Sequence, residues 1–179
     1  MRRQIRSLIE NIDPFDKLEA DHRLKALKWI DSGQGLFRLQ KPATPDPHLV
    51  SYFVLFDPTT KKILLVDHKK AQLWLPSGGH VEPNEHPKTT AERECLEELS
   101  ITADFLFDTP IFITVTKTVG LTAGHTDVSL WYLLRGDSAQ TPIFDEDEFY
   151  AVQWFPLGQL PHDNTDPHLS RFENKFIHL

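Results

Sequence analysis

The sequence predicts a mixed α/β fold in which helices cover a β-sheet. One observation is a series of apolar, β-branched and aromatic runs that read as strands. A second is a set of stretches with apolar residues at helical spacing, one of them after a glycine pair and one near the C-terminus. Helices in those positions favour an α/β/α layering. With 179 residues, 40% of them hydrophobic and 25% charged, the chain can bury one full core.

Residues 1–31 are predicted to form two helices. Their apolar residues at helical spacing are Ile5, Leu8, Ile9 and Ile12 in the first helix, and Leu18, Leu24, Leu27 and Ile30 in the second, with Trp29 at its edge. Asp13 is the expected N-cap of the second helix, with Pro14 at its first position. These helices could cover the sheet, cap a substrate pocket or form a dimer interface.

The rest of the chain alternates strands with loops. The expected strands are residues 36–39, 50–56, 62–68, 104–107, 111–119, 127–135 and 150–155, of which the second and third form a hairpin. A short helix is expected near 169–176, and residues 41–47 are a proline-rich connector. We therefore expect an N-terminal helical extension with its connector at 1–47, followed by the main domain at 48–179.

An acidic helix is predicted after the glycine pair. Glu94, Glu97 and Glu98 stand at positions i, i+3 and i+4, which share one face of a helix. Crowded carboxylates repel one another and raise one another's pKa, and a divalent cation such as Mg²⁺, which takes carboxylate oxygens, would reverse that cost. We expect Arg93 to brace these acids, and Cys95, Leu96 and Leu99 to lie on the opposite, buried side.

The segment from 79 to 101 resembles the Nudix hydrolase signature. Its fixed positions are filled by Gly79, Glu85, Arg93, Glu94, Glu97, Glu98 and Ile101 at the required spacing. Ser100 stands where the family usually has glycine, just past the helix end where a left-handed backbone is favoured. The resemblance implies a Nudix-like α/β/α sandwich with a mixed sheet.

The resemblance also implies an activity. A MutT-like enzyme of this family hydrolyses a diphosphate linkage in a nucleoside diphosphate derivative, with Mg²⁺ or Mn²⁺ as cofactor. A house-cleaning role is one of the roles that this resemblance implies. Glu97, Glu98 and the carbonyl of Gly79 are the implied metal ligands. Glu94 is implied either as a ligand or as the general base, and Arg93 as the residue that holds a glutamate in place.

Further candidates lie outside the acidic helix. Trp74, His80, His125 and Asp127 are candidate substrate contacts, although packing or surface roles would explain each of them. One member of the acidic run 145–148, Glu146 or Glu148, could supply an additional acid. Glu85 is expected to anchor its loop.

The sequence argues against three other functions. A non-catalytic nucleotide sensor on the same fold would be expected to lose the metal-binding glutamates, and all are present. An isopentenyl diphosphate isomerase needs a catalytic cysteine, but the sole Cys95 faces the apolar side. The net charge of −7 argues against decapping and against duplex nucleic acid. One cysteine and the absence of a long apolar run predict a cytoplasmic protein without a membrane span, and a homodimer stays open.

Overall fold

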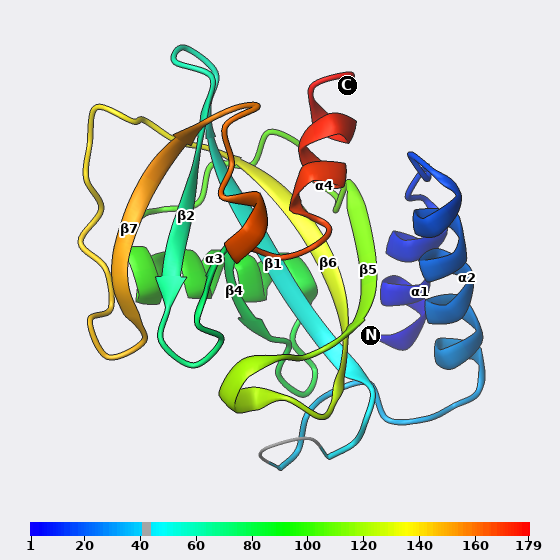
Figure 1. Cartoon of the computed structure of the whole chain (residues 1–179). Coiled ribbons are helices and arrows are strands. Elements are labelled where there is room, and N and C mark those ends of the chain that lie inside the picture. The colour runs from blue at the N-terminus through cyan, green and yellow to red at the C-terminus, as the bar shows by residue number, and fades with distance from the viewer. Residues whose placement is uncertain (41–43) are drawn as a thin grey trace.

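The computed structural model describes residues 1–40 and 44–179, and it contains one mixed β-sheet with helices on both faces (Figure 1). The strands are β1 (His48–Asp57), β2 (Lys62–His68), β3 (Leu73–Leu75), β4 (Ser77–His80), β5 (Phe112–Lys117), β6 (Thr126–Arg135) and β7 (Phe149–Pro156). The helices are α1 (Arg2–Glu10), α2 (Lys17–Asp31), α3 (Pro87–Leu99) and α4 (Leu169–Phe176), with short 3₁₀ turns at Gly120–Thr122 and His162–Asn164.

The sheet is mixed because β1 and β6 run parallel while its other pairs are antiparallel. The main strand order is β3-β2-β1-β6-β5, and β7 lies along the other edge of β2. One edge of β1 is shared between two partners: residues 50–53 pair with β4, and residues 56–57 pair with β2. The predicted hairpin of β1 and β2 is therefore confirmed, although the pairing is short.

Alternation along the strands sorts the apolar side chains onto two faces. In β1, Phe53 and Leu55 join the core beneath α3, whereas Val54 and Phe56 join the core beneath α4. A strand places successive side chains on opposite faces, so a strand covered on both sides reads as a nearly continuous apolar run. The predicted α/β/α layering is thereby confirmed (Figure 1).

The two N-terminal helices form a pair that packs beside β5 (Figure 1). The cap prediction was wrong, because Asp16 caps α2 by accepting a hydrogen bond from the Glu19 backbone N–H at 2.8 Å. Much of the predicted apolar face was wrong as well, since Leu24 is 51% exposed and Leu18 is also exposed. The buried side chains of α2 are Glu19, His22, Ala26, Trp29 and Ile30.

The buried carboxylate of Glu19 in α2 has partners that lie far along the chain. Glu19 Oε1 receives a hydrogen bond from Lys175 Nζ of α4 at 2.8 Å, and both side chains are buried. The same oxygen accepts from the Ile113 backbone N–H of β5 at 3.3 Å. A buried carboxylate is tolerated when it is paired and hydrogen-bonded in this way.

Three local predictions differ from the structure. Described residues 36–39 form no strand, and the expected strand at 104–107 is a single bridge between Phe105 and Leu134. Gly78 and Gly79 lie in strand β4, not in a loop, because β4 pairs with β1. Part of the proline-rich connector, 41–43, lies outside the described residues. Among the residues described, none of the helices is both long and apolar enough to span a lipid bilayer.

Candidate active site

A cavity of about 870 Å³ opens between β4, α3 and the ends of β5 and β6. Its volume falls in the range of small-molecule sites. The predicted metal-site residues Gly79, Glu94, Glu97 and Glu98 all line it. Helix α3 delivers the three acids, and it begins with His86 as N-cap and Pro87 at its first turn. It ends at Ser100, whose φ of 54° and ψ of 31° lie in the left-handed region.

Glu98 is the most deeply placed of the three acids, with only 7% of the residue exposed. Its Oε2 accepts a hydrogen bond from the hydroxyl of Ser77. Burial raises the pKa of Glu98 to about 8, and the nearby charges of Glu94 and Glu148 act in the same direction. The buried position of Glu98 differs from that of an acid on an exposed helix face, because β4 and residues 145–148 enclose the end of α3.

Glu94 is partly buried and held by Arg93. Burial is the main cause that raises the pKa of the Glu94 carboxyl, against the lowering effect of the guanidinium. Arg93 Nη1 lies 2.7 Å from Glu94 Oε1 and 3.2 Å from Glu97 Oε2, and Arg93 Nε lies 3.0 Å from Glu85 Oε1. Arg93 thus braces three carboxylates, as expected for a positioning residue.

Glu85 anchors the loop before α3. Its carboxylate accepts from the Thr90 hydroxyl at 2.7 Å and from the Glu82 backbone N–H at 3.1 Å. These contacts, with the pairing to Arg93, tie the loop to the first turns of the helix. The expectation that Glu85 serves as a loop anchor agrees with this geometry.

The glycine pair is required by close approach. A Cβ on Gly79 would lie 2.0 Å from Glu94 Oε1, so only glycine lets that carboxylate lie over the strand. Gly78 has a φ of 147°, and a Cβ there would lie 2.2 Å from the Ser51 backbone oxygen. The two glycines therefore allow α3 and β1 to approach β4 from different sides.

The structure distinguishes the two candidates for the additional acid. Glu148 lines the cavity, and its Oε1 lies 3.2 Å from Lys70 Nζ. Glu146 is not among the described residues that line the cavity. Glu148 therefore joins the three acids of α3 in one electrostatic group.

Some of the predicted substrate contacts line the cavity and one does not. His80, His125 and Asp127 line the cavity. Trp74 is absent from the described lining, and its ring packs edge-on against Phe155 at 5.2 Å between centroids. Leu96, expected to be buried, is 58% exposed, whereas Cys95 and Leu99 are buried as predicted. Burial raises the pKa of the Cys95 thiol to about 12, which leaves it inert as a nucleophile.

Several cavity residues were missed from the sequence. Arg38, Lys70 and Lys117 add positive charge to the lining, and Ser77 contacts Glu98. His48, at the start of β1, contacts the wall of the cavity through Asp127. None of these residues belongs to a local sequence motif. The only signal in the sequence was the position of a basic residue near the end of a predicted strand.

Solved structures of other proteins share this architecture. A NUDIX-family hydrolase from Clostridium perfringens superposes with a TM-score of 0.57 at 22% identity, covering 75% of this chain and 94% of that one. The MutT NUDIX hydrolase from Burkholderia pseudomallei gives 0.52 at 26% identity, with 70% and 93% covered. The E. coli dihydroneopterin triphosphate pyrophosphohydrolase gives 0.55 at 16% identity, with 73% and 94% covered, and at that identity it supports the fold alone.

Sequence comparison identifies the family itself. The NUDIX domain model matches residues 46–176. The human protein named nucleoside diphosphate-linked moiety X motif 6 is 32% identical over 120 residues, which make up 65% of this chain and 37% of that protein. This chain thus spans well under half of that relative's length. It belongs to the Nudix hydrolase family, as the signature from Gly79 to Ile101 predicted.

Proposed function

We propose that the chain is a metal-dependent hydrolase that cleaves a diphosphate linkage in a nucleoside diphosphate derivative. The observation that carries the proposal is the gathering of Glu94, Glu97, Glu98 and Glu148 on one cavity. The human relative named for a nucleoside diphosphate-linked moiety supports this substrate class. Cavity residues Arg38, Lys70 and Lys117 would attract an anionic nucleotide despite the net charge of −7.

The acids fit a divalent cation of the Mg²⁺ or Mn²⁺ kind. Their donors are oxygens, which these hard cations prefer. Burial raises the pKa of both the Glu94 and the Glu98 carboxyl, and the charges of neighbouring acids act in the same direction. Glu94, Glu97, Glu98 and the carbonyl of Gly79 would hold the cation. When bound, it would neutralise charge on the phosphoryl oxygens and acidify the attacking water.

The chain's own residues position and polarise the reactants. Arg93 fixes Glu94 and Glu97 through contacts of 2.7 and 3.2 Å, which keeps both carboxylates aimed along the cavity. Glu148 is the additional acid we assign to this site, and with Glu94 it is a candidate to accept the proton of the attacking water. The water oxygen attacks phosphorus, the phosphorus–oxygen bond of the diphosphate bridge breaks, and the leaving phosphate carries away the bonding pair.

A substrate screen with matched variants tests the proposal. Phosphate release would be measured over nucleoside triphosphates, nucleotide sugars and dinucleoside polyphosphates, with Mg²⁺ or Mn²⁺ and after chelation. Glu98→Gln and Glu97→Gln should lower turnover, whereas Glu92→Gln, an exposed change on the same helix, should not. Metal-independent turnover, or full activity in both active-site variants, would overturn the mechanism.

The sensor function remains the second candidate, and the same screen separates it. A sensor would bind a nucleotide without releasing phosphate under any metal condition. The retained signature glutamates favour catalysis. The homodimer and the cytoplasmic location remain predictions, of which light scattering on the purified chain tests the first.

A further inference from the structure

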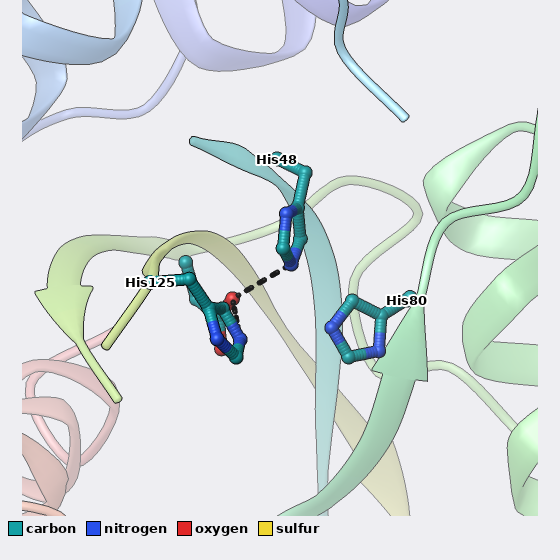
Figure 2. Close-up of side chains that lie close together, drawn as sticks. His48, His80 and His125 are labelled. Atoms are coloured by element: carbon teal, nitrogen blue, oxygen red, sulfur yellow. Dashed lines mark ion pairs between the residues drawn. The ribbon is translucent and has the colours of Figure 1, made fainter. Parts of the chain in front are cut away.

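Three histidines and an aspartate gather beside the proposed diphosphate site. His48 begins β1, His80 ends β4, and His125 and Asp127 flank the start of β6. One ligand atom from each of the four lies within 4.8 Å of all the others. Figure 2 shows the three imidazole rings turned toward a common space.

Strand register explains why residues so distant in sequence meet. His48 is the partner of Asp127 in the parallel pairing of β1 with β6, and His80 is the partner of Val50 in the pairing of β1 with β4. The cluster therefore stands on three adjacent strands, which are rigid elements. A site on strands holds its ligands more precisely than a site on loops.

His48 is fully buried, and its two ring nitrogens have different surroundings. Nδ1 lies 2.8 Å from the Pro45 carbonyl oxygen, and because a carbonyl can only accept, Nδ1 carries the proton. In the neutral ring Nε2 then presents a lone pair. A ring nitrogen fixed from behind by a carbonyl, with the other nitrogen free to coordinate, is the usual arrangement of a metal-binding histidine.

That lone pair faces a carboxylate oxygen. His48 Nε2 lies 3.2 Å from Asp127 Oδ1, yet neither buried atom has a hydrogen-bond partner among the described residues. The two atoms are close but not aligned as donor and acceptor. Two buried acceptors at this distance repel unless the imidazole takes up a second proton or a cation lies between or beside them.

His125 converges on the same oxygen. Its Nε2 lies 3.4 Å from Asp127 Oδ1, and its Nδ1 lies 3.3 Å from the hydroxyl of Thr118. Ligands about 2.0–2.1 Å from a tetrahedral zinc ion stand about 3.4 Å apart. The spacings of Asp127 Oδ1 to His48 Nε2 and to His125 Nε2 match that value. A ligand atom of His80 lies within 4.8 Å of those of the other three residues, which makes His80 the fourth donor of the set.

Arg38 is the alternative cation for Asp127. Its guanidinium lines the same cavity and is attracted to this carboxylate. Within the part of the chain that the structure describes, however, Arg38 forms no ion pair with Asp127, whose Oδ1 lies instead 3.2 Å and 3.4 Å from ring nitrogens of His48 and His125. Arg38 therefore leaves the convergence of the ring nitrogens on Asp127 unexplained.

We infer that His48, His80, His125 and Asp127 form a second metal site, specific for a transition-metal ion of the Zn²⁺ type. Three imidazole nitrogens and one carboxylate oxygen suit Zn²⁺ or Co²⁺, whereas Mg²⁺ prefers oxygen donors alone. The second site thus differs in chemistry from the carboxylate site of α3. It pins the ends of β1, β4 and β6 at the wall of the substrate cavity.

Cobalt binding tests this inference without reference to turnover. The 179-residue chain, stripped with a chelator, would be titrated with Co²⁺ in millimolar Mg²⁺, which keeps the α3 carboxylates occupied. We expect one equivalent to bind with the visible absorption bands of tetrahedral cobalt and to be displaced by one equivalent of Zn²⁺. Failure to bind an equivalent under these conditions would overturn the site.

Variants assign the ligands. Asp127→Asn and His48→Gln, which nearly keep the side-chain volumes, should weaken Co²⁺ binding at least 100-fold, and His125→Gln should do the same. The exposed His178→Gln should bind as the parent does, and so should Glu98→Gln, which separates this site from the proposed catalytic one. Circular dichroism in chelator reports folding of each variant. Unchanged cobalt binding in folded Asp127→Asn or His125→Gln would refute the assignment even if His48→Gln fails to fold.

Discussion

Replacing Glu98 by glutamine should make the metal-free protein more stable at neutral pH. The Glu98 carboxyl is buried, and its pKa is raised from an ordinary value of 4.5 to about 8. Between these two values the folded state holds a proton that the unfolded state releases. The free energy of unfolding therefore falls as the pH rises from about 4.5 through about 8.

The magnitude follows from that interval. From 4.5 to pH 7 is about 2.5 pH units, each of which corresponds to about 1.4 kcal/mol, so the folded state loses about 3 kcal/mol through Glu98 alone. Glutamine resembles the protonated acid in shape and still accepts the hydrogen bond from Ser77. Glu98→Gln should recover that loss at pH 7 and gain almost nothing at pH 4.5.

Urea unfolding in chelator at several pH values between 4.5 and 8.5 measures the effect. Glu97→Gln is the control, because that carboxylate is 60% exposed and its change should alter stability by less than about 0.5 kcal/mol. Added Mg²⁺ should reduce the difference in the free energy of unfolding between Glu98→Gln and the parent, because it should stabilise the parent alone. A stability difference between parent and Glu98→Gln that is the same at pH 5 and pH 8 would refute the reasoning.

Three further outcomes are expected. Gly79→Ala should lower kcat about 10- to 100-fold, because the added Cβ displaces the Glu94 carboxylate, while the melting temperature stays nearly constant; an unchanged kcat would contradict the packing described at this strand. Glu148→Gln should lower kcat by about 10-fold or more, whereas Glu146→Gln should not. Steady-state kinetics on the two variants measures this, and a larger loss of kcat in Glu146→Gln would contradict the assignment of Glu148 as the additional acid. Ser100→Gly should raise stability by about 1 kcal/mol, or the melting temperature by about 2–4 °C, because the left-handed backbone at φ 54° strains a side chain; a lower melting temperature would count against strain at the helix end.

Local patterns made the acidic helix α3 predictable from the sequence. The spacing of Glu94, Glu97 and Glu98 depends only on helical periodicity, and Arg93 braces residues within a few positions of itself. The strands of the sheet were predictable from the sequence because their apolar runs are long. The left-handed end at Ser100 also follows from the helix itself.

Contacts between distant segments were not predictable in the same way. The burial of Glu98 depends on Ser77 and on the packing of the segment near Asp145, whose N–H donates to the Glu98 carbonyl at 2.8 Å. His48 joins Asp127 only through the register of β1 with β6. The polar face of α2 was misread because the partner of Glu19 is Lys175, near the other end of the chain.

The ion pair of Glu19 with Lys175 joins α2 to α4 and so limits where the chain can be truncated. The family match covers 46–176 and so includes Lys175 but not Glu19. A fragment trimmed to that match would leave Lys175 without its carboxylate, and it would expose the apolar core side chains that α1 and α2 cover. Expression of residues 46–176 alone should therefore give an insoluble or poorly folded product, and α1 and α2 belong in any fragment made for assay.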